Sequence, residues 1–197
     1  MSEIRAKSMN RAVFLDRDGV IIHDKNYLSK PEDVEFIAGA FEGLRLLQEN
    51  GFLLIIVTNQ SGIGRGYFTI DDMNRVHEYI ASKCAEHGIR FARIYYAPEA
   101  PGQPSYGRKP SPRFLFDAQK EFKVDLSRSY MIGDKLVDLE CGWNAGVRRC
   151  ILVRTGYGSE LEKSQPQAIK DAVIVNDISE AASWILSDIE DHGSERS

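Results

Sequence analysis

Cysteine is scarce in this sequence, and its placement excludes two common kinds of site. The only cysteines among the 197 residues are Cys84, Cys141 and Cys150, and they show no metal-binding spacing. A set that is odd in number and scattered along the chain also argues against a disulfide framework. We therefore interpret all three as reduced thiols of a cytosolic protein.

Long apolar runs and a strong excess of either charge are absent as well. No stretch approaches the roughly 18 apolar residues that a membrane span needs. The first ten residues, MSEIRAKSMN, lack the apolar core of a secretory signal. The formal net charge of −4 at pH 7 gives no basic field that would attract nucleic acid or an anionic membrane. The sequence thus predicts a cytoplasmic protein with neither kind of partner.

What the chain does contain is a globular composition in a regular alternation. It is 43% hydrophobic and 27% charged, which at this length favours one domain over residues 11–190, with flexible ends at 1–10 and 191–197. Short apolar runs alternate with helical patterns, which is typical of parallel strands joined by crossover helices. We expect an α/β, three-layer Rossmann-like fold with a mainly parallel sheet. The expected strands are 12–15, 53–57, 93–96, 129–132, 150–153 and 172–175, and the expected helices are 40–50, 70–86, 112–122, 135–145 and 178–189.

The stretch AVFLDRDGVI, residues 12–21, places Asp16 and Asp18 at the end of the first expected strand. Other chemically capable side chains stand at similar places. Thr58 follows the second strand, Asp134 follows the fourth, and Lys109 leads into the helix before the fourth strand. Because ligands of such sheets bind at the carboxyl ends of the strands, we expect these residues to lie together at one edge.

Carboxylates and an ammonium group at one sheet edge suit a divalent cation and a phosphate. Asp16 and Asp134 offer the oxygen ligands that Mg²⁺ prefers, and Lys109 with the Thr58 loop suits the phosphate oxygens. Once the phosphate charge is neutralised, an aspartate can attack phosphorus and form an aspartyl-phosphate. Asp18, two residues from Asp16, is placed to protonate the leaving alcohol.

Three further features allow more modest interpretations. Asp138 is either a supporting partner of Lys135 or Arg17, or an exposed acid in the first turn of a helix. The glycine-rich residues 62–66 match no nucleotide-binding motif, so we interpret them as a flexible substrate loop. His77 and His87 are expected on the surface of a helix.

Four motifs in order resemble those of the haloacid dehalogenase-like phosphatases: FLDRDGVI, VTNQSG, RKPSP and IGDKLVD. Within that superfamily, the chain is more narrowly similar to the D-glycero-D-manno-heptose 1,7-bisphosphate 7-phosphatases, through the stretches FLDRDGVI, NQSGIGRG, MIGDKLVDLECG and VRTGYG. The close relatives of these enzymes are the histidinol-phosphate phosphatases. The resemblance covers residues 13–158. It implies a haloacid dehalogenase-like fold and a Mg²⁺-dependent enzyme of lipopolysaccharide or other surface-sugar synthesis.

The resemblance also implies a role for each matching residue. Asp16 would be the nucleophile and a metal ligand. Asp18 would be the general acid and base, and its backbone carbonyl would join the Asp134 side chain on the metal. Thr58 and Lys109 would steady the transferring phosphoryl group. The residues expected to bind the rest of the substrate are Asp24, Lys25, Asn26, Tyr27, Asn59, Gln60, Ser61, Arg108 and Lys135.

One loop departs from the family pattern. These phosphatases usually carry a zinc-binding loop, Cys-x-His followed by Cys-x-Cys, just before the Arg-Lys motif. Here the stretch reads YYAPEAPGQPSYGRKP, with Ala97 and Glu99 at the places of the first pair and no cysteine or histidine after them. Because structural zinc needs four nitrogen or sulfur ligands, we predict no zinc.

The spacing of the motifs leaves no room for a cap domain, because predicted helices and strands already fill the stretches between them. We therefore expect an open site in a monomer that hydrolyses a sugar phosphate, with heptose 1,7-bisphosphate the first substrate candidate. Histidinol phosphate or another small phosphomonoester is the enzymatic alternative. A non-hydrolytic phosphosugar-binding protein is an alternative of another class.

Overall fold

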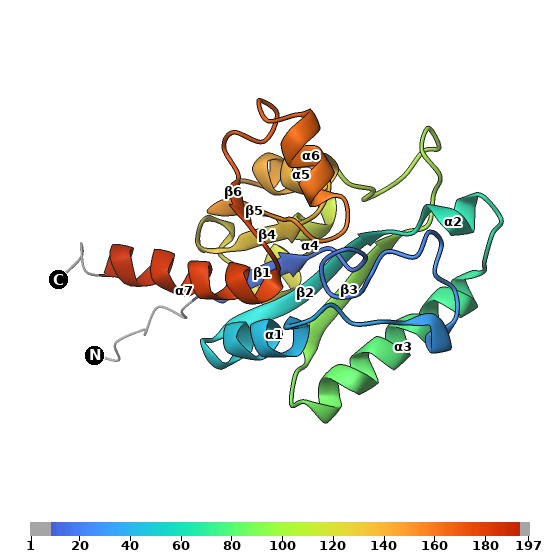
Figure 1. Cartoon of the computed structure of the whole chain (residues 1–197), viewed down its shortest axis with the longest axis horizontal. Coiled ribbons are helices and arrows are strands. Elements are labelled where there is room, and N and C mark those ends of the chain that lie inside the picture. The colour runs from blue at the N-terminus through green and yellow to red at the C-terminus, as the bar shows by residue number, and fades with distance from the viewer. Residues whose placement is uncertain (1–8, 194–197) are drawn as a thin grey trace, which may run out of the picture.

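Six parallel strands form one sheet at the centre of the computed structural model, which describes residues 9–193 (Figure 1). The strand order is β3-β2-β1-β4-β5-β6, so the chain builds outward from β1 in one direction and then returns to add β4 on its other side. The strands are β1 (Arg11–Leu15), β2 (Phe52–Asn59), β3 (Phe91–Ala97), β4 (Tyr130–Gly133), β5 (Arg149–Val153) and β6 (Val173–Val175).

Helices cover both faces of this sheet and give three layers (Figure 1). The helices are α1 (Ala40–Glu49), α2 (Ser61–Gly64), α3 (Ile70–Glu86), α4 (Arg113–Phe122), α5 (Leu136–Ala145), α6 (Gly158–Ser164) and α7 (Ile178–Gly193), with 3-10 turns η1 (Pro31–Asp33) and η2 (Leu126–Arg128). Alternate residues of β1 face opposite layers. Val13 and Leu15 pack with α1, α3 and α7, whereas Ala12 and Phe14 pack with α4, α5 and α6.

The sheet order brings the predicted motifs to one place. Leu15, the last residue of β1, pairs with Ile56 of β2 on one side and with Ile132 of β4 on the other. The strand order reverses between β1 and β4, and open α/β sheets bind ligands at such a reversal. Asp16 and Asp134 follow β1 and β4, and Thr58 lies one residue before the end of β2.

The α/β fold with a parallel sheet is confirmed, and each expected strand and helix is present with small shifts at its ends. Helices α2 and α6 were not predicted, because they are short and their apolar patterns are weak. One N-terminus also differs: α4 begins at Arg113, and Pro112 takes the cap position without a side-chain hydrogen bond. The expected helix 112–122 therefore starts one residue too early.

The expectation of a surface position for His77 is wrong. Its side chain is only 7% exposed, and burial together with the nearby Arg17 lowers the pKa of His77 to about 3. His77 lies four residues after Met73 and three before Ile80, which is the spacing of the buried face of α3. His87, at the end of α3, is exposed and stacks on Phe41.

The predicted flexible ends fall mostly outside the described residues, since 1–8 and 194–197 are not among them. Within the described part, Asn10 pairs with Val124 in an isolated bridge, and α7 continues to Gly193. No helix in residues 9–193 is long and apolar enough to cross a membrane. The three cysteines are buried and unpaired.

The N-terminus of α3 generates a stability prediction. Thr69 Oγ1 accepts a hydrogen bond from the Asp72 backbone at 3.1 Å, and the Asp72 carboxylate accepts one from the Thr69 backbone at 2.8 Å. Thr69→Ala removes half of this reciprocal cap and should lower the free energy of unfolding in urea by about 1 kcal/mol. Thr69→Ser keeps the hydroxyl and serves as the control; equal losses in both variants would contradict the cap.

Candidate active site

A cavity of about 210 Å³ opens at the carboxyl ends of β1, β2 and β4. Most of the residues predicted for the site line it: Asp16, Asp18, Asp24, Asn26, Tyr27, Asn59, Gln60, Ser61, Lys109 and Lys135. The lining also includes residues outside the predicted set, namely Arg17, Leu28, Gly62, Phe68, Val137, Asp138 and Tyr157. Four predicted residues do not line it: Lys25, Thr58, Arg108 and Asp134.

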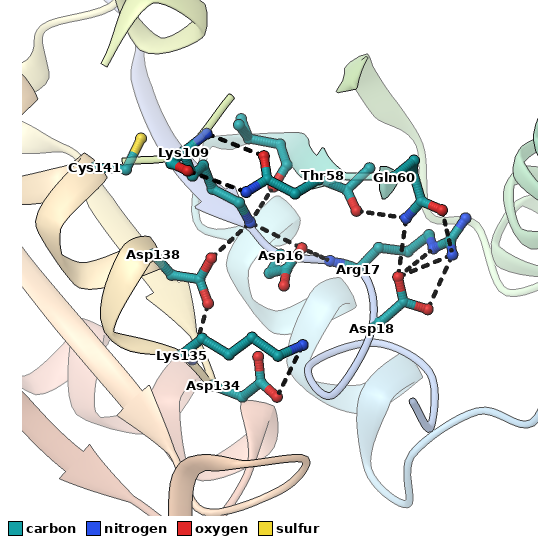
Figure 2. Close-up of polar contacts among 12 residues, drawn as sticks. Asp16, Arg17, Asp18, Thr58, Gln60, Lys109, Asp134, Lys135, Asp138 and Cys141 are labelled. Carbon is teal, nitrogen blue, oxygen red and sulfur yellow. Dashed lines mark hydrogen bonds and ion pairs between the residues drawn. The ribbon is translucent and has the colours of Figure 1, made fainter. Parts of the chain in front are cut away.

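Lys109 is the buried cation at the centre of this site (Figure 2). Its ammonium group lies 2.9 Å from Asp16 Oδ1 and 2.6 Å from Asp138 Oδ1, and it donates to the Val57 carbonyl at 2.7 Å. Asn59 fixes the Lys109 backbone through two hydrogen bonds. Burial alone would lower the pKa of Lys109, but Asp138 and Asp16 raise it above its ordinary value, so the group stays charged.

Asp16 is buried yet ionised. Burial pushes the pKa of its carboxyl group upward, but Lys109 and then Lys135 outweigh this effect and hold the pKa below its ordinary value. The backbone N–H of Arg17 also donates to Asp16 Oδ1 at 2.8 Å. The same oxygen accepts from Lys109, so the second oxygen, Oδ2, is the freer of the two for attack or metal binding.

Asp134 is the most confined acid of the site. An added Cβ at Gly19 or Gly156 would lie 2.3 or 2.2 Å from Asp134 Oδ2, and both glycines have positive φ angles. That oxygen accepts from the Tyr157 backbone at 2.9 Å, while Oδ1 is buried without a hydrogen-bond partner. Burial, together with Asp138 and Asp16, raises the pKa of Asp134 to about 8.

Asp138 is neither exposed nor paired with Arg17. It is fully buried, its carboxylate contacts the Lys109 ammonium, and Oδ2 accepts from the backbone N–H of Lys135 at 2.9 Å. Its supporting partners are therefore the Lys109 side chain and the Lys135 main chain. Gly133 permits this approach, since a Cβ there would lie 2.1 Å from the Cβ of Asp138.

The carboxylates of Asp16, Asp134 and Asp138 fit a divalent cation. One oxygen from each lies within 4.8 Å of the other two, and the unpartnered Oδ1 of Asp134 needs a positive partner. Oxygen donors of this kind suit Mg²⁺. The Asp18 carboxylate lies apart from this group, against Arg17 and Gln60 (Figure 2); a contribution from its backbone carbonyl stays a prediction.

Lys135 and aromatic residues line the mouth of the cavity. Lys135 Nζ lies 3.0 Å from Asp24 Oδ2 and 4.7 Å from the centre of the Tyr157 ring. Asn26 and Tyr27 have left-handed backbone conformations, and Tyr27 meets Tyr67 edge to face. By contrast, Lys25 turns away and pairs with Glu35.

The loop that departs from the zinc pattern is held by hydrogen bonds between its own residues. Ser105 Oγ donates to the Glu99 carboxylate at 2.6 Å and accepts from the Arg108 backbone at 3.1 Å. The Arg108 guanidinium donates to the Glu99 carbonyl at 2.9 Å. The loop also packs against α2, where the Gly64 backbone N–H donates to the Pro98 carbonyl at 2.8 Å.

Comparison with known proteins identifies the family. Residues 106–181 match the family model described as HAD-hydrolase-like. The D-glycero-beta-D-manno-heptose-1,7-bisphosphate 7-phosphatase of Helicobacter pylori J99 is 43% identical over 145 residues, 73% of this chain and 83% of that protein. This chain belongs to the heptose-1,7-bisphosphate 7-phosphatase family. The Chlorobaculum tepidum member is 41% identical over 176 residues, 83% of this chain and 88% of that protein.

Solved structures of the heptose-1,7-bisphosphate 7-phosphatase family share the fold. The D,D-heptose 1,7-bisphosphate phosphatase of B. bronchiseptica, crystallised with magnesium and phosphate, has a TM-score of 0.82 at 28% identity, covering 90% of this chain and 99% of that one. The Burkholderia thailandensis enzyme has a TM-score of 0.70 at 26% identity with the same coverage. These matches extend beyond residues 106–181 to most of the chain.

Several residues that line this site were not predicted from the sequence, although some of them lie within the motifs. Tyr157 lies within the VRTGYG stretch that resembles the family, but only the structure brings its backbone to Asp134 and its ring to Lys135. Phe68 follows the glycine-rich loop, which was itself expected near substrate. Arg17 stands between the two aspartates of the first motif, a signal that could have singled it out.

The acidic cluster predicts a link between metal binding and stability. Mg²⁺ that binds the folded cluster alone stabilises the protein by about 2.7 kcal/mol at roughly 100 times its Kd, which is roughly 5–10 °C in Tm for a chain of this length. Asp134→Asn should abolish this shift and leave the metal-free Tm no lower than that of the wild type, because the amide cannot acquire the negative charge that burial and the neighbouring acids oppose. Thermal unfolding with Mg²⁺ or EDTA measures both effects.

The exposed Asp171 provides the matched control for this experiment. Asp171→Asn makes the same substitution at a residue that neither lines the cavity nor belongs to the cluster, and it should keep the full Mg²⁺ shift. A full shift in Asp134→Asn would contradict the assignment of Asp134 to the metal.

Proposed function

We propose that this chain is a Mg²⁺-dependent phosphatase that removes the 7-phosphate of D-glycero-D-manno-heptose 1,7-bisphosphate through an aspartyl-phosphate. The observation that carries the proposal is the buried, ionised Asp16 carboxylate beside the Lys109 ammonium and the acidic cluster. The names and the identities of the relatives support the choice of substrate.

The first half of the reaction forms a covalent intermediate on Asp16. Its free oxygen attacks phosphorus in line with the leaving sugar oxygen, and the phosphorus–oxygen bond to the sugar breaks. Lys109 offsets the charge of both the nucleophile and the phosphate, and Asp18 gives its proton to the departing oxygen. Mg²⁺, when bound by Asp16 and Asp134, would neutralise phosphate charge and orient the group.

The second half regenerates the enzyme. Asp18, now ionised, takes a proton from a water molecule as that water attacks phosphorus. The bond between phosphorus and the Asp16 oxygen breaks, and inorganic phosphate leaves with Asp16 again a carboxylate. Asp138 keeps Lys109 aimed at the reacting group, since both of its oxygens are committed to Lys109 and the Lys135 backbone.

The rest of the substrate would be bound by the mouth of the cavity. Lys135, Asp24 and Asn26 offer polar partners for sugar hydroxyls, and Tyr27 and Tyr157 offer faces for the ring. We infer a single capless domain over residues 11–190, working as a monomer in the cytoplasm, as part of lipopolysaccharide or other surface-sugar synthesis. Relatives named for the alpha and for the beta anomer both match this chain at similar identity, so either anomer fits the proposal.

Phosphate release from both anomers of the bisphosphate, from histidinol phosphate and from common sugar phosphates tests this proposal. Mg²⁺-dependent turnover should be fastest on one heptose anomer. Asp16→Asn is the blank and should lose at least about 10³-fold in kcat, because an amide is a poor nucleophile. Faster turnover of histidinol phosphate would reassign the substrate, whereas tight binding of sugar phosphate without release would favour a binding protein.

The hydrogen-bonded loop 97–108 predicts activity without zinc. Purified enzyme should contain far less than one zinc per chain by elemental analysis, and a zinc-selective chelator should leave Mg²⁺-supported turnover unchanged. Stoichiometric zinc would overturn this prediction. Glu99→Gln, which weakens the contact with Ser105, tests the hydrogen bonds themselves and should raise KM more than it lowers kcat.

A further inference from the structure

We propose that Gln60 is a positioning residue that holds the general acid Asp18 in a single orientation for proton transfer. The sequence motif predicts a substrate contact for Gln60, but the structure commits its side chain to protein partners. The inference rests on the proposed function, since it takes Asp18 as the acid of a phosphatase. It concerns how that acid is aimed, which the motif does not specify.

Both the NH₂ group and the carbonyl oxygen of the Gln60 side chain are hydrogen-bonded to protein groups (Figure 2). Nε2 donates to Thr58 Oγ1 at 2.8 Å and to Asp18 Oδ2 at 3.0 Å, so both of its hydrogens are used. Oε1 accepts from Arg17 NH2 at 3.2 Å. The residue is 4% exposed. Little of this amide is left to recognise a ligand.

The chemistry of the neighbours fixes which way the amide points. Arg17 can only donate hydrogen bonds, so the carbonyl oxygen of Gln60 must face it. An ionised Asp18 can only accept, so the NH₂ group must face Asp18. The main chain fixes the position as well, because the Gln60 backbone N–H donates to the Ala97 carbonyl of β3 at 2.8 Å. The sheet thereby sets the place of the Asp18 carboxylate.

The contacts on Asp18 are unequal, and this inequality selects the oxygen that carries the proton. Oδ2 accepts from Arg17 Nε at 3.1 Å as well as from Gln60, whereas the hydrogen bond on Oδ1 comes from Arg17 NH2 alone at 2.9 Å. Two donors fill the lone pairs of Oδ2, and Oδ1 keeps one free. The geometry therefore places the transferable proton on Oδ1.

Loss of Gln60 would release this arrangement. Arg17 would still bind the Asp18 carboxylate. However, Asp18 Oδ2 would lose the hydrogen-bond donor of Gln60, and the Arg17 guanidinium would lose an acceptor. The carboxylate could then rotate against the guanidinium. A general acid acts only at hydrogen-bond distance from the leaving oxygen. Loss of the general acid lowers the rate of turnover more for a substrate whose leaving oxygen is more basic. A nitrophenolate can leave without being protonated, whereas a sugar oxygen must receive a proton as it leaves.

The test compares two leaving groups in the full-length enzyme with Mg²⁺. The variant is Gln60→Met, which fills similar space without hydrogen bonds, and kcat/KM is measured for heptose 1,7-bisphosphate and for 4-nitrophenyl phosphate. We expect a loss of about 10- to 100-fold on the sugar phosphate, and a loss at least tenfold smaller on the aryl phosphate. Loss of the Thr58 contact would affect both substrates alike.

Three further variants make the result decisive. Gln60→Glu keeps the size of the side chain and the acceptor for Arg17, but it places an oxygen in front of Asp18 instead of a donor. It should show the same selective loss as Gln60→Met. With two variants, the test does not depend on the folding of either one alone. Adding Gln60→Met to Asp18→Asn should change the ratio no further. Gln48 is bonded at both ends of its amide, to Gly88 and Arg90, away from the cavity, and Gln48→Met should leave the ratio at the wild-type value.

Equal losses on the two substrates in both Gln60 variants would overturn the inference and leave the phosphatase intact. An additive effect in the Asp18→Asn background would overturn it too, because Gln60 would then act without Asp18. A wild-type enzyme that releases no phosphate from any alkyl ester would overturn the proposed function, and the inference with it.

Discussion

The active site depends on one buried ammonium group held between carboxylates. Lys109 contacts Asp16 and Asp138 directly. Burial raises the pKa values of both acids; Lys109 and Lys135 bring that of Asp16 below its ordinary value, whereas that of Asp138 stays above its own. Removing Lys109 would leave two buried carboxylates without this shared cation, and an uncompensated buried charge is strongly destabilising. The cation that faces Asp134 is Lys135, which lies 3.8 Å from Asp134 Oδ2 and 3.0 Å from Asp24 Oδ2, and burial together with Asp138 and Asp16 still raises the pKa of Asp134 to about 8. The three acids Asp16, Asp134 and Asp138 thus outnumber the two ammonium groups of Lys109 and Lys135 by one.

That shortage explains why the local backbone is so restrictive. The backbone of Gly19 and Gly156 packs closely against the Asp134 carboxylate, and the backbone of Gly133 packs closely against the Asp138 side chain. Repelling groups stay together only where the surrounding chain leaves them nowhere else to go. Strands β1 and β4 supply this rigidity, because they lie side by side at the reversal of the strand order. The chemistry and the topology therefore depend on each other.

The sequence predicted the fold well because buried parallel strands read as continuous apolar runs, as 12–15 and 150–153 do. It predicted Asp16, Thr58 and Asp134 at one edge because the carboxyl ends of parallel strands meet there. The pairing of Asp138 with Lys109 could not be predicted, since it depends on how α5 is rotated against the loop before α4. The Tyr157 contact depends on the path of the chain after β5. Neither is a property of local sequence.

The three thiol groups of the protein are buried, and Cys141 lies close to Lys109 (Figure 2). Burial raises the pKa values of Cys84, Cys141 and Cys150 to about 12, so these thiols stay protonated at neutral pH. The loop beside the cavity carries Glu99 and Ser105 in hydrogen-bonded contact, and it contains no sulfur. Peroxide or a disulfide therefore finds no nucleophilic sulfur at the cavity, and oxidative stress that would strip a cysteine-bound metal has no such target in this loop.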